Sequence, residues 1–194
     1  MDDAEDPIEL FREWFALASE REPDVPDAFA LATASADGAP AVRMLLLKGF
    51  DASGFRFFTN LESRKGGDLA ANPVAAMCFH WKSLARQVRI EGPVEPIPAE
   101  EADAYFASRD LGSRIGAWAS LQSRPLPDRS VLETRVAEFT ERFRDGEVPR
   151  PGHWSGFRLV PSRIEFWLDQ PSRLHDRLEY LRDGERWTSQ RLYP

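Results

Sequence analysis

Short strand-like runs joined by turn signals dominate this sequence and limit the folds that it can adopt. Runs 28–35 and 40–50 flank Asp37-Gly38, a dipeptide typical of β-hairpins, and a last hairpin is expected to turn at Asp183-Gly184. The other runs with strand character cover residues 55–60, 74–81, 84–94, 156–160 and 164–168. Because short turns join neighbouring runs, we expect antiparallel pairing in a barrel or a sandwich.

Helices are inserted among these strands and do not alternate with them. Asp6 suits a helix N-cap and Pro7 the first helical position, and apolar residues then recur at helical spacing, so a helix is expected at about 6–20. Shorter helical segments are expected at about 63–71, 98–108, 115–119 and 130–143. No glycine-rich dinucleotide or phosphate loop follows a strand. The sequence therefore predicts an α+β fold in one domain over residues 1–194.

The charge distribution limits the partners. The net charge of -7 argues against nucleic acid and anionic membranes as partners. The segment from Arg43 to Arg89 carries eight basic and three acidic residues, a net charge of +5, so the rest of the chain carries -12. This basic segment is either a solvated face or a binding region for a small phosphorylated ligand.

Nothing in the sequence indicates export or a metal site. The acidic start at residues 1–6 is unlike a secretory signal, and no apolar run approaches the roughly 20 residues that a membrane span needs. The one cysteine, Cys78, is expected to be a buried small hydrophobe. His80, His153 and His175 lack the spacing of metal ligands. We expect a cytoplasmic protein without a metal.

Two cationic motifs lie in the basic segment. Ser63-Arg64-Lys65 opens a predicted helix, where free N–H groups favour an anion, although a solvated surface motif would look the same. Arg43 and Lys48 lie five residues apart on an apolar strand, so a regular strand would point them to opposite faces. Both could approach one phosphate only with a bulge or across a subunit interface.

A second set of candidates lies outside these motifs. Gln87 is either a structural amide or a partner for the pyrimidine edge of a flavin. Tyr105, Arg109 and Ser113 are spaced four apart and would share one helical face, although Gly112 interrupts the pattern.

Strand alternation after Trp167 places Arg173, His175 and Arg177 on one face. This row is either a site wall or an exposed edge strand.

Several segments together resemble the pyridoxamine phosphate oxidase family. They are Arg43-Met-Leu-Leu-Leu-Lys48, Phe58-Thr-Asn60 with Ser63-Arg-Lys65, Arg86-Gln-Val88, Ser113-Arg-Ile-Gly-Ala-Trp118 with Gln122-Ser123, Trp154 to Phe157, Ile164-Glu-Phe-Trp167, Arg173-Leu-His-Asp-Arg177 and Arg191-Leu-Tyr-Pro194. The resemblance runs from about Asp6 to the end of the chain, in order and with the expected spacing. One such motif would be weak, whereas the whole set is specific.

The resemblance implies an antiparallel split β-barrel with peripheral helices, a homodimer, and flavin mononucleotide (FMN) at the subunit interface. It implies a C-terminal dimerisation and substrate segment at about 154–194. The implied FMN contacts are Arg43, Met44, Leu45, Leu46, Leu47, Lys48, Phe58, Thr59, Arg64, Lys65, Gln87, Gln122, Ser123, Trp167 and Arg177. The implied ligands of the substrate phosphate are Lys48, Tyr105, Arg109 and Ser113. Arg173 and His175 would cover the pyridine ring as catalytic residues.

The activity implied is oxidation of pyridoxamine 5'-phosphate and pyridoxine 5'-phosphate to pyridoxal 5'-phosphate. Hydride would pass to flavin N5, and O2 would reoxidise the flavin and give hydrogen peroxide. Two features depart from the family pattern. Phe58 stands where a tyrosine is common, and the chain begins almost at its first predicted helix, where members often carry an extension that folds over the substrate.

Two alternatives to this activity remain. One is a flavin oxidase of the same fold with another substrate, such as a phenazine-pathway enzyme. The other is a non-catalytic protein that binds flavin or pyridoxal phosphate. The joint presence of the residues proposed for the phosphate and the ring favours the vitamin B6 substrate; these are Lys48, Tyr105, Arg109, Ser113, Arg173 and His175.

Overall fold

The computed structural model describes residues 4–194, so the predicted acidic start lies partly outside the described residues. The helices are α1 (Pro7–Arg21), α2 (Arg64–Ala71), α3 (Ala99–Ser108), α4 (Leu111–Ala119) and α5 (Arg129–Arg142), and short 3-10 turns lie at Lys82–Leu84 and Pro171–Arg173. The strands are β1 (Ala28–Ala34), β2 (Pro40–Leu46), β3 (Phe50–Asp51), β4 (Gly54–Asn60), β5 (Val74–Trp81), β6 (Arg86–Pro96), β7 (Trp154–Leu159), β8 (Arg163–Leu168), β9 (Asp176–Asp183) and β10 (Arg186–Arg191).

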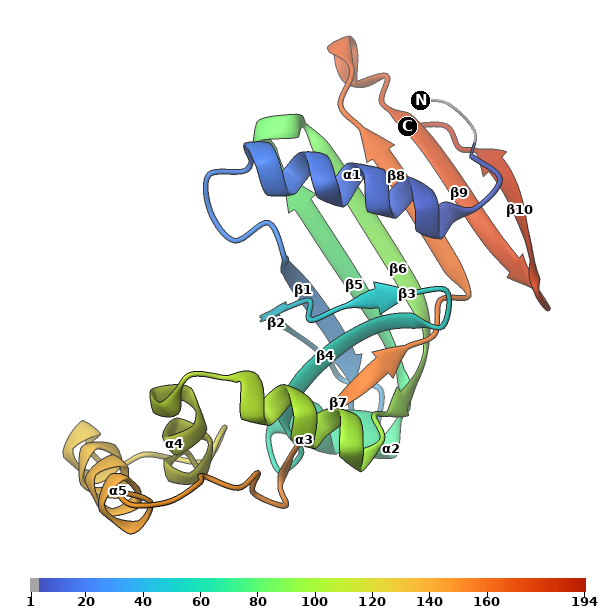
Figure 1. The fold of residues 1–194 in the computed structure, drawn as a ribbon. Coiled ribbons are helices and arrows are strands. Elements are labelled where there is room, and N and C mark those ends of the chain that lie inside the picture. Colours follow the sequence, from blue (N-terminus) through green and yellow to red (C-terminus); the bar gives the residue numbers. More distant parts are fainter. Residues whose placement is uncertain (1–3) are drawn as a thin grey trace.

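The strands form one curled antiparallel sheet. Its main path runs β10-β9-β8-β6-β5-β1-β2, and β4 joins it through β7, which also pairs with β6. Figure 1 shows β4 and β7 turned across the end of the main sheet, while α1 lies across the sheet's upper part. The expected α+β fold, an antiparallel split β-barrel with peripheral helices, is confirmed.

Strand β6 connects the two parts of the barrel. Its first half pairs with β8 and its last residues pair with β7. Gly92 lies between these two stretches, and a Cβ there would lie 2.0 Å from the carbonyl oxygen of Val160. A glycine at this position therefore allows these two backbones to approach closely, between the stretch of β6 that pairs with β8 and the stretch that pairs with β7.

The core lies between α1 and the sheet. Asp6 caps α1 by accepting from the Ile8 N–H at 2.8 Å, as its sequence position predicts. Phe11 on this helix is fully buried, and the rings in contact with it are Phe15, Phe50, Phe55, Phe79 and Trp81. Strand β1 alternates buried and half-buried residues, so one face of this strand belongs to the core.

Two local expectations need correction. The run 40–50 is not one strand, because the chain bends after Leu46: the Leu47 side chain enters the core, and Gly49 has φ of 149°. Lys48 is consequently outside the regular strand. Cys78 is half-buried rather than buried, and burial raises the pKa of its thiol.

The structure also adds two negative findings for residues 4–194. No helix in this range is both long and apolar enough to cross a membrane. No three or more His, Cys, Asp and Glu side chains in the same range are grouped so that they could hold a metal ion.

Candidate functional site

A cavity of about 790 Å³ lies between β2, β4 and the helices α3 and α4. Its size is in the range of cofactor and small-molecule sites. Ten of the predicted site residues line it, and they are Met44, Leu45, Leu46, Lys48, Phe58, Thr59, Tyr105, Arg109, Ser113 and Gln122. Residues from segments far apart in the sequence thus meet in one cavity, and it was the family resemblance that had grouped these segments.

The substrate-phosphate candidates are brought together by a break between two helices. Helix α3 ends at Ser108, and Asp110 caps α4 by accepting from the Ser113 N–H at 2.8 Å. The break therefore lies at Arg109 and Asp110 rather than at Gly112. Tyr105, Arg109 and Ser113 still line the same cavity, from two helices instead of one.

Arg109 is a cavity-lining cation with a buried donor atom. Its guanidinium lies 5.0 Å from the centre of the Trp154 ring, and burial lowers its pKa. Among the described residues, no group accepts a hydrogen bond from its buried Nη1 atom. A buried donor without a partner is costly, so this atom is suited to an anionic oxygen from a ligand.

Lys48 is the second cation in the cavity. Its Nζ atom lies 2.9 Å from Oδ2 of Asp27, and both side chains are about a quarter exposed. Asp27 therefore balances the charge of Lys48. Sequence reasoning did not identify Asp27, which lies 21 residues earlier in the chain.

An aromatic wall faces these cations. The Phe58 ring stacks on Tyr105 with centroids 4.1 Å apart and on Trp154 with centroids 5.3 Å apart. Trp154 lines the cavity and was not among the predicted site residues. Thr59 follows Phe58, and no described residue bonds to its buried hydroxyl oxygen. The wall provides a flat apolar surface, and beside it lies the Thr59 hydroxyl, which bonds to no described residue.

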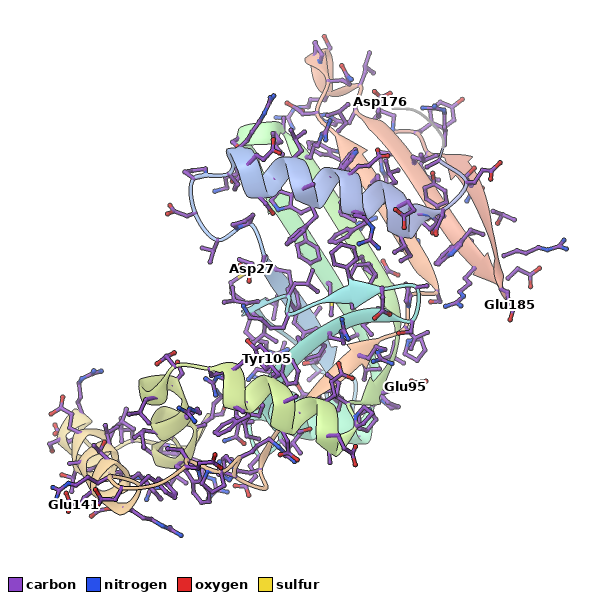
Figure 2. The ribbon with its side chains drawn as sticks, viewed as in Figure 1. Asp27, Glu95, Tyr105, Glu141, Asp176 and Glu185 are labelled. Carbon is purple, nitrogen blue, oxygen red and sulfur yellow. The ribbon has the colours of Figure 1, made fainter. Side chains whose placement is uncertain are left out.

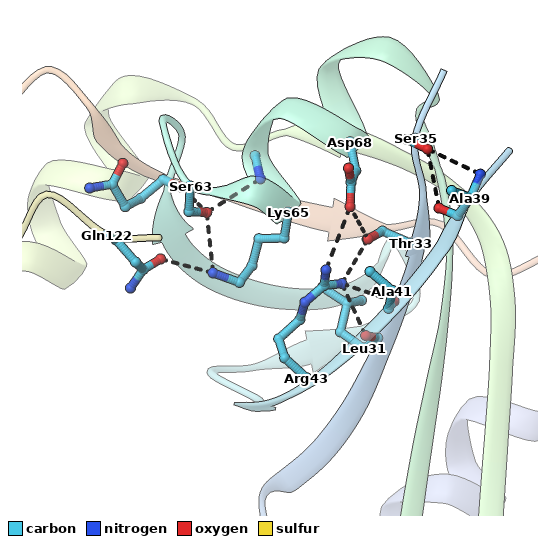
Figure 3. Close-up of polar contacts among 12 residues, drawn as sticks. Leu31, Thr33, Ser35, Ala39, Ala41, Arg43, Ser63, Lys65, Asp68 and Gln122 are labelled. Carbon is cyan, nitrogen blue, oxygen red and sulfur yellow. Dashed lines mark hydrogen bonds and ion pairs between the residues drawn. The ribbon is translucent and has the colours of Figure 1, made fainter. Parts of the chain in front are cut away.

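The first turn of α2 adds a buried lysine next to the cavity. Lys65 donates to Oε1 of Gln122 at 2.8 Å and to the Ser63 hydroxyl at 3.2 Å (Figure 3). Burial and then the nearby Arg43 lower the pKa of Lys65. A bound anion would favour the charged form. Arg64, its neighbour, is exposed.

Arg43 is held by a buried carboxylate that sequence reasoning missed. Its Nη2 atom lies 3.5 Å from Oδ2 of Asp68, and its Nη1 atom donates to the Thr33 hydroxyl at 2.7 Å. Thr33 in turn donates to Asp68 at 2.6 Å (Figure 3). Asp68 lies on α2, so this contact joins the helix that carries Arg64 and Lys65 to the strand that carries Arg43.

Replacing Asp68 by asparagine is expected to lower the free energy of unfolding by about 1–2 kcal/mol. The change keeps the size of the side chain but removes the charge that faces Arg43 in a buried setting. Urea denaturation of the ligand-free protein measures the effect. Asp183→Asn, at an exposed position on the last hairpin, is the matched control. If Asp68→Asn lowered the free energy of unfolding no more than the control does, the contact between Asp68 and Arg43 would not stabilise the fold.

A second group of predicted residues lies across β6, β8 and β9. Gln87 pairs with Trp167, and Trp167 pairs with Arg177, so the three form one row across the sheet. Arg177 donates to Oε1 of the buried Glu165 at 2.8 Å. Glu165 also pairs with Arg89, and its pKa is lowered, because hydrogen bonds from both arginines outweigh its burial. Glu165 thus holds the Arg177 end of this row.

The prediction that Arg173, His175 and Arg177 share a strand face is wrong. Pro171–Arg173 forms a 3-10 turn, and β9 begins only at Asp176. Ser172 and Arg173 have φ of 60° and 61°, a conformation that no regular strand contains. Pro171 starts the turn, because its ring restricts φ and it has no N–H for a strand ladder.

The remaining predicted contacts lie outside the cavity lining. The Leu47 side chain packs in the core, and its N–H donates to the carbonyl of Asp27 at 2.8 Å. Ser123 is exposed with φ of 71°. Both remain predictions for contacts with FMN.

Comparison with known proteins decides the family. A sequence model described as pyridoxamine 5'-phosphate oxidase matches residues 20–143. A second, described as the pyridoxine 5'-phosphate oxidase C-terminal dimerisation region, matches residues 154–194. The chain belongs to the pyridoxamine 5'-phosphate oxidase family.

Individual members of this family are similar over nearly the whole chain. The pyridoxine/pyridoxamine 5'-phosphate oxidase of Rhodospirillum rubrum is 61% identical, covering 97% of this chain and 96% of its own. That of Gluconobacter oxydans is 60% identical, covering 97% and 94%. Among solved structures, PhzG from Burkholderia lata 383, in complex with tetrahydrophenazine-1-carboxylic acid, has a TM-score of 0.94 and 35% identity, covering 100% of this chain and 95% of its own.

Trp167 and Arg177 of the second group lie in the family's dimerisation region, whereas Gln87 lies outside it, on β6. From β2, which borders the cavity, to β9, which carries Arg177, the sheet crosses five strand intervals. At about 4.8 Å per interval this is about 24 Å along the sheet. Figure 2 shows Tyr105 beside the helices at one end of the molecule and Asp176 at the opposite end, on the sheet. None of Gln87, Trp167 and Arg177 lines the cavity, so within one subunit the cavity and the Gln87 row are separate.

Proposed function

We propose that this chain oxidises pyridoxamine 5'-phosphate and pyridoxine 5'-phosphate to pyridoxal 5'-phosphate, with FMN as its bound redox cofactor. The observation that carries the proposal is the buried, unpartnered Nη1 atom of Arg109 in a cavity that also holds Lys48, Tyr105 and Ser113. These residues are the ones expected to hold the substrate phosphate. The names and similarity of the family members support the same activity.

The residues around α2 fit a phosphorylated cofactor. Arg43, Arg64 and Lys65 supply positive charge near the first turn of this helix, and Gln122 is already bonded to Lys65. The buried Lys65 donates to two neutral side chains, those of Gln122 and Ser63, and its burial lowers its pKa. When bound, FMN supplies the flavin ring that accepts hydride. The protein contributes binding, orientation and exclusion of water.

The proposed roles of the cavity residues follow from their positions. Arg109 and Lys48 would hold the substrate phosphate through charge-assisted hydrogen bonds, and Tyr105 and Ser113 would add donors. For Lys48, the phosphate would take the place of Asp27 as the partner. The stacked rings of Phe58, Tyr105 and Trp154 would keep water from one side of the site.

The site is proposed to be completed by a second subunit. Arg177 and the loop with Arg173 and His175 lie too far along the sheet to reach the cavity of the same subunit, and Gln87 and Trp167 do not line it. The exposed apolar side chains of Val42, Met44 and Leu46 on the edge strand β2 offer a surface for association. A homodimer would bring the ring-covering residues of one copy to the cavity of the other.

The proposal includes a cytoplasmic location. It agrees with a chain whose one cysteine has no partner for an internal disulfide.

A second candidate function is oxidation of a phenazine precursor. The structural similarity to PhzG favours it, because that protein has the same fold and was solved with a tetrahydrophenazine. Phosphate dependence separates the two candidates. An enzyme for the vitamin B6 substrate needs Arg109 and Lys48 for a phosphate, whereas a carboxylated phenazine would leave most of this cationic pocket unused.

One experiment tests the function directly. The protein is loaded with FMN, oxygen is removed, and pyridoxine 5'-phosphate is added while the visible absorbance of the flavin is recorded. We expect bleaching that reverses in air, with pyridoxal 5'-phosphate as the product, and almost none with unphosphorylated pyridoxine. A flavin that stays oxidised with both phosphorylated substrates would contradict the proposal, and a tetrahydrophenazine would then be the next substrate to add.

A further inference from the structure

The segment between β8 and β9 is fixed by several hydrogen bonds. The Asp169 N–H donates to the carbonyl of Ala85 at 2.9 Å, and the Gln170 side chain donates to Asp176 at 2.8 Å. The turn itself closes through the Leu174 N–H, which donates to the carbonyl of Pro171 at 3.2 Å. These contacts hold His175 in a defined place although it lies outside regular structure.

One nitrogen of the His175 ring faces two competing partners. Its Nδ1 atom lies 2.9 Å from Oδ1 of Asp169 and 3.2 Å from the backbone nitrogen of Gln170. The ring also packs against Trp167, with centroids 4.6 Å apart and planes tilted by 41°. The His175 side chain is only 19% exposed, so water has limited access to the ring and competes little with these contacts.

The two contacts require opposite protonation states of Nδ1. To accept from the Gln170 N–H, this nitrogen must carry a lone pair, which would then face the Asp169 carboxylate at 2.9 Å. To donate to Asp169, it must carry a proton, and the longer Gln170 contact is then no hydrogen bond. The second arrangement is favoured because the shorter contact has a charged acceptor, while the first opposes a lone pair and an anion.

We propose that Asp169 is a positioning residue that holds the His175 ring with Nδ1–H directed at its carboxylate. The neutral ring then has its lone pair on Nε2, so Nε2 is the atom offered to a ligand as an acceptor. In this role Asp169 acts through His175 and not directly on a ligand. The role in turnover rests on the proposed function, in which His175 covers the pyridine ring.

The sequence gives no local sign of this role. Asp169 follows the Phe166-Trp167 motif and lies six residues before His175, a spacing without meaning on a strand or a helix. Only the turn at Pro171–Arg173 folds the chain back so that the two side chains meet.

Nitrogen NMR of ring-labelled histidine tests the tautomer in the ligand-free protein, independently of any activity. The chain has three histidines, and a His175→Gln variant identifies the signals of His175. At alkaline pH we expect a protonated Nδ1 and an unprotonated Nε2. His153 is an internal control with the opposite expectation, because its Nε2 lies 3.0 Å from the carbonyl oxygen of Ala117 and must donate to it. A His175 ring protonated at Nε2 would overturn the proposal.

Variants of Asp169 test what the contact does. Asp169→Asn keeps the shape of the side chain but can turn its amide to donate to Nδ1, so we expect the Nδ1–H preference to be lost. We expect kcat/KM to fall roughly 10- to 100-fold, the size of effect seen for carboxylates that orient metal-bound histidines. FMN affinity should be unchanged. Asp169→Glu, which keeps the carboxylate, should recover part of both readouts, while Asp183→Asn should alter neither.

The outcomes separate this proposal from the proposed function. If the wild-type protein does not oxidise either phosphorylated substrate, the function fails, and the NMR result still decides the tautomer. If the wild-type protein is active and Asp169→Asn has unchanged kcat/KM or an unchanged tautomer, the positioning role of Asp169 is wrong.

Discussion

Replacing Arg173 by alanine is expected to lower kcat/KM for pyridoxine 5'-phosphate by about 100-fold or more, while FMN affinity changes by less than about twofold. The proposed partner of Arg173 is the pyridine ring, and a lost orienting contact has effects of about this size. Arg173 is exposed, and no hydrogen bond or ion pair joins its side chain to another described residue, so its removal should not disturb the fold.

Steady-state kinetics at saturating FMN and a fluorescence titration with FMN measure the two effects separately. Arg129→Ala is the control, because Arg129 is an exposed arginine on α5 whose ion pair with Glu133 contributes little. If Arg173→Ala weakened FMN binding as much as turnover, Arg173 would belong to the cofactor site and the present assignment would be wrong. Because Arg173 has φ of 61°, the thermal midpoint of the variant should also be checked.

The combined change Arg64→Ala and Lys65→Met is expected to raise the Kd for FMN by about 100-fold or more. Charge-assisted hydrogen bonds contribute about 1.5–3 kcal/mol each, and about 2.7 kcal/mol corresponds to a factor of 100 in affinity. Methionine keeps most of the volume of Lys65, which is buried beside Ser63 and Gln122. The effect should therefore come from lost charge rather than from a cavity.

Fluorescence titration measures the affinity, and kinetics at very high FMN show whether turnover recovers. Lys82→Met, an exposed lysine outside the site, is the matched control. Recovery of most of the activity at saturating FMN would support a role in cofactor binding. A large fall in kcat with unchanged Kd for FMN would contradict it, and would place these two residues at the substrate.

Several parts of the fold could be predicted because their signals are local. Asp6 and Pro7 mark the start of α1, and Asp37-Gly38 and Asp183-Gly184 mark two hairpins, since capping and turn geometry depend on only a few neighbouring residues. The family was also predictable from the order and spacing of its motifs. The activity then followed as an implication of the family rather than from any one residue.

The tertiary structure alone decided how the candidate residues meet. Asp68 contacts Arg43, and Lys65 contacts Gln122, which lies 57 residues later in the chain. Neither pair has a spacing that the period of a helix or a strand would reveal in the sequence. The turn at Pro171–Arg173 replaced an expected strand, because a proline and two residues with positive φ cannot form a regular ladder. The sequence by itself thus determined the helices, the hairpins and the family, whose signals lie within short stretches of chain. The structure decided the cavity, the buried partners of its cations and the separation of the site into two parts, because these depend on the curl of the sheet and on contacts between residues far apart in the chain.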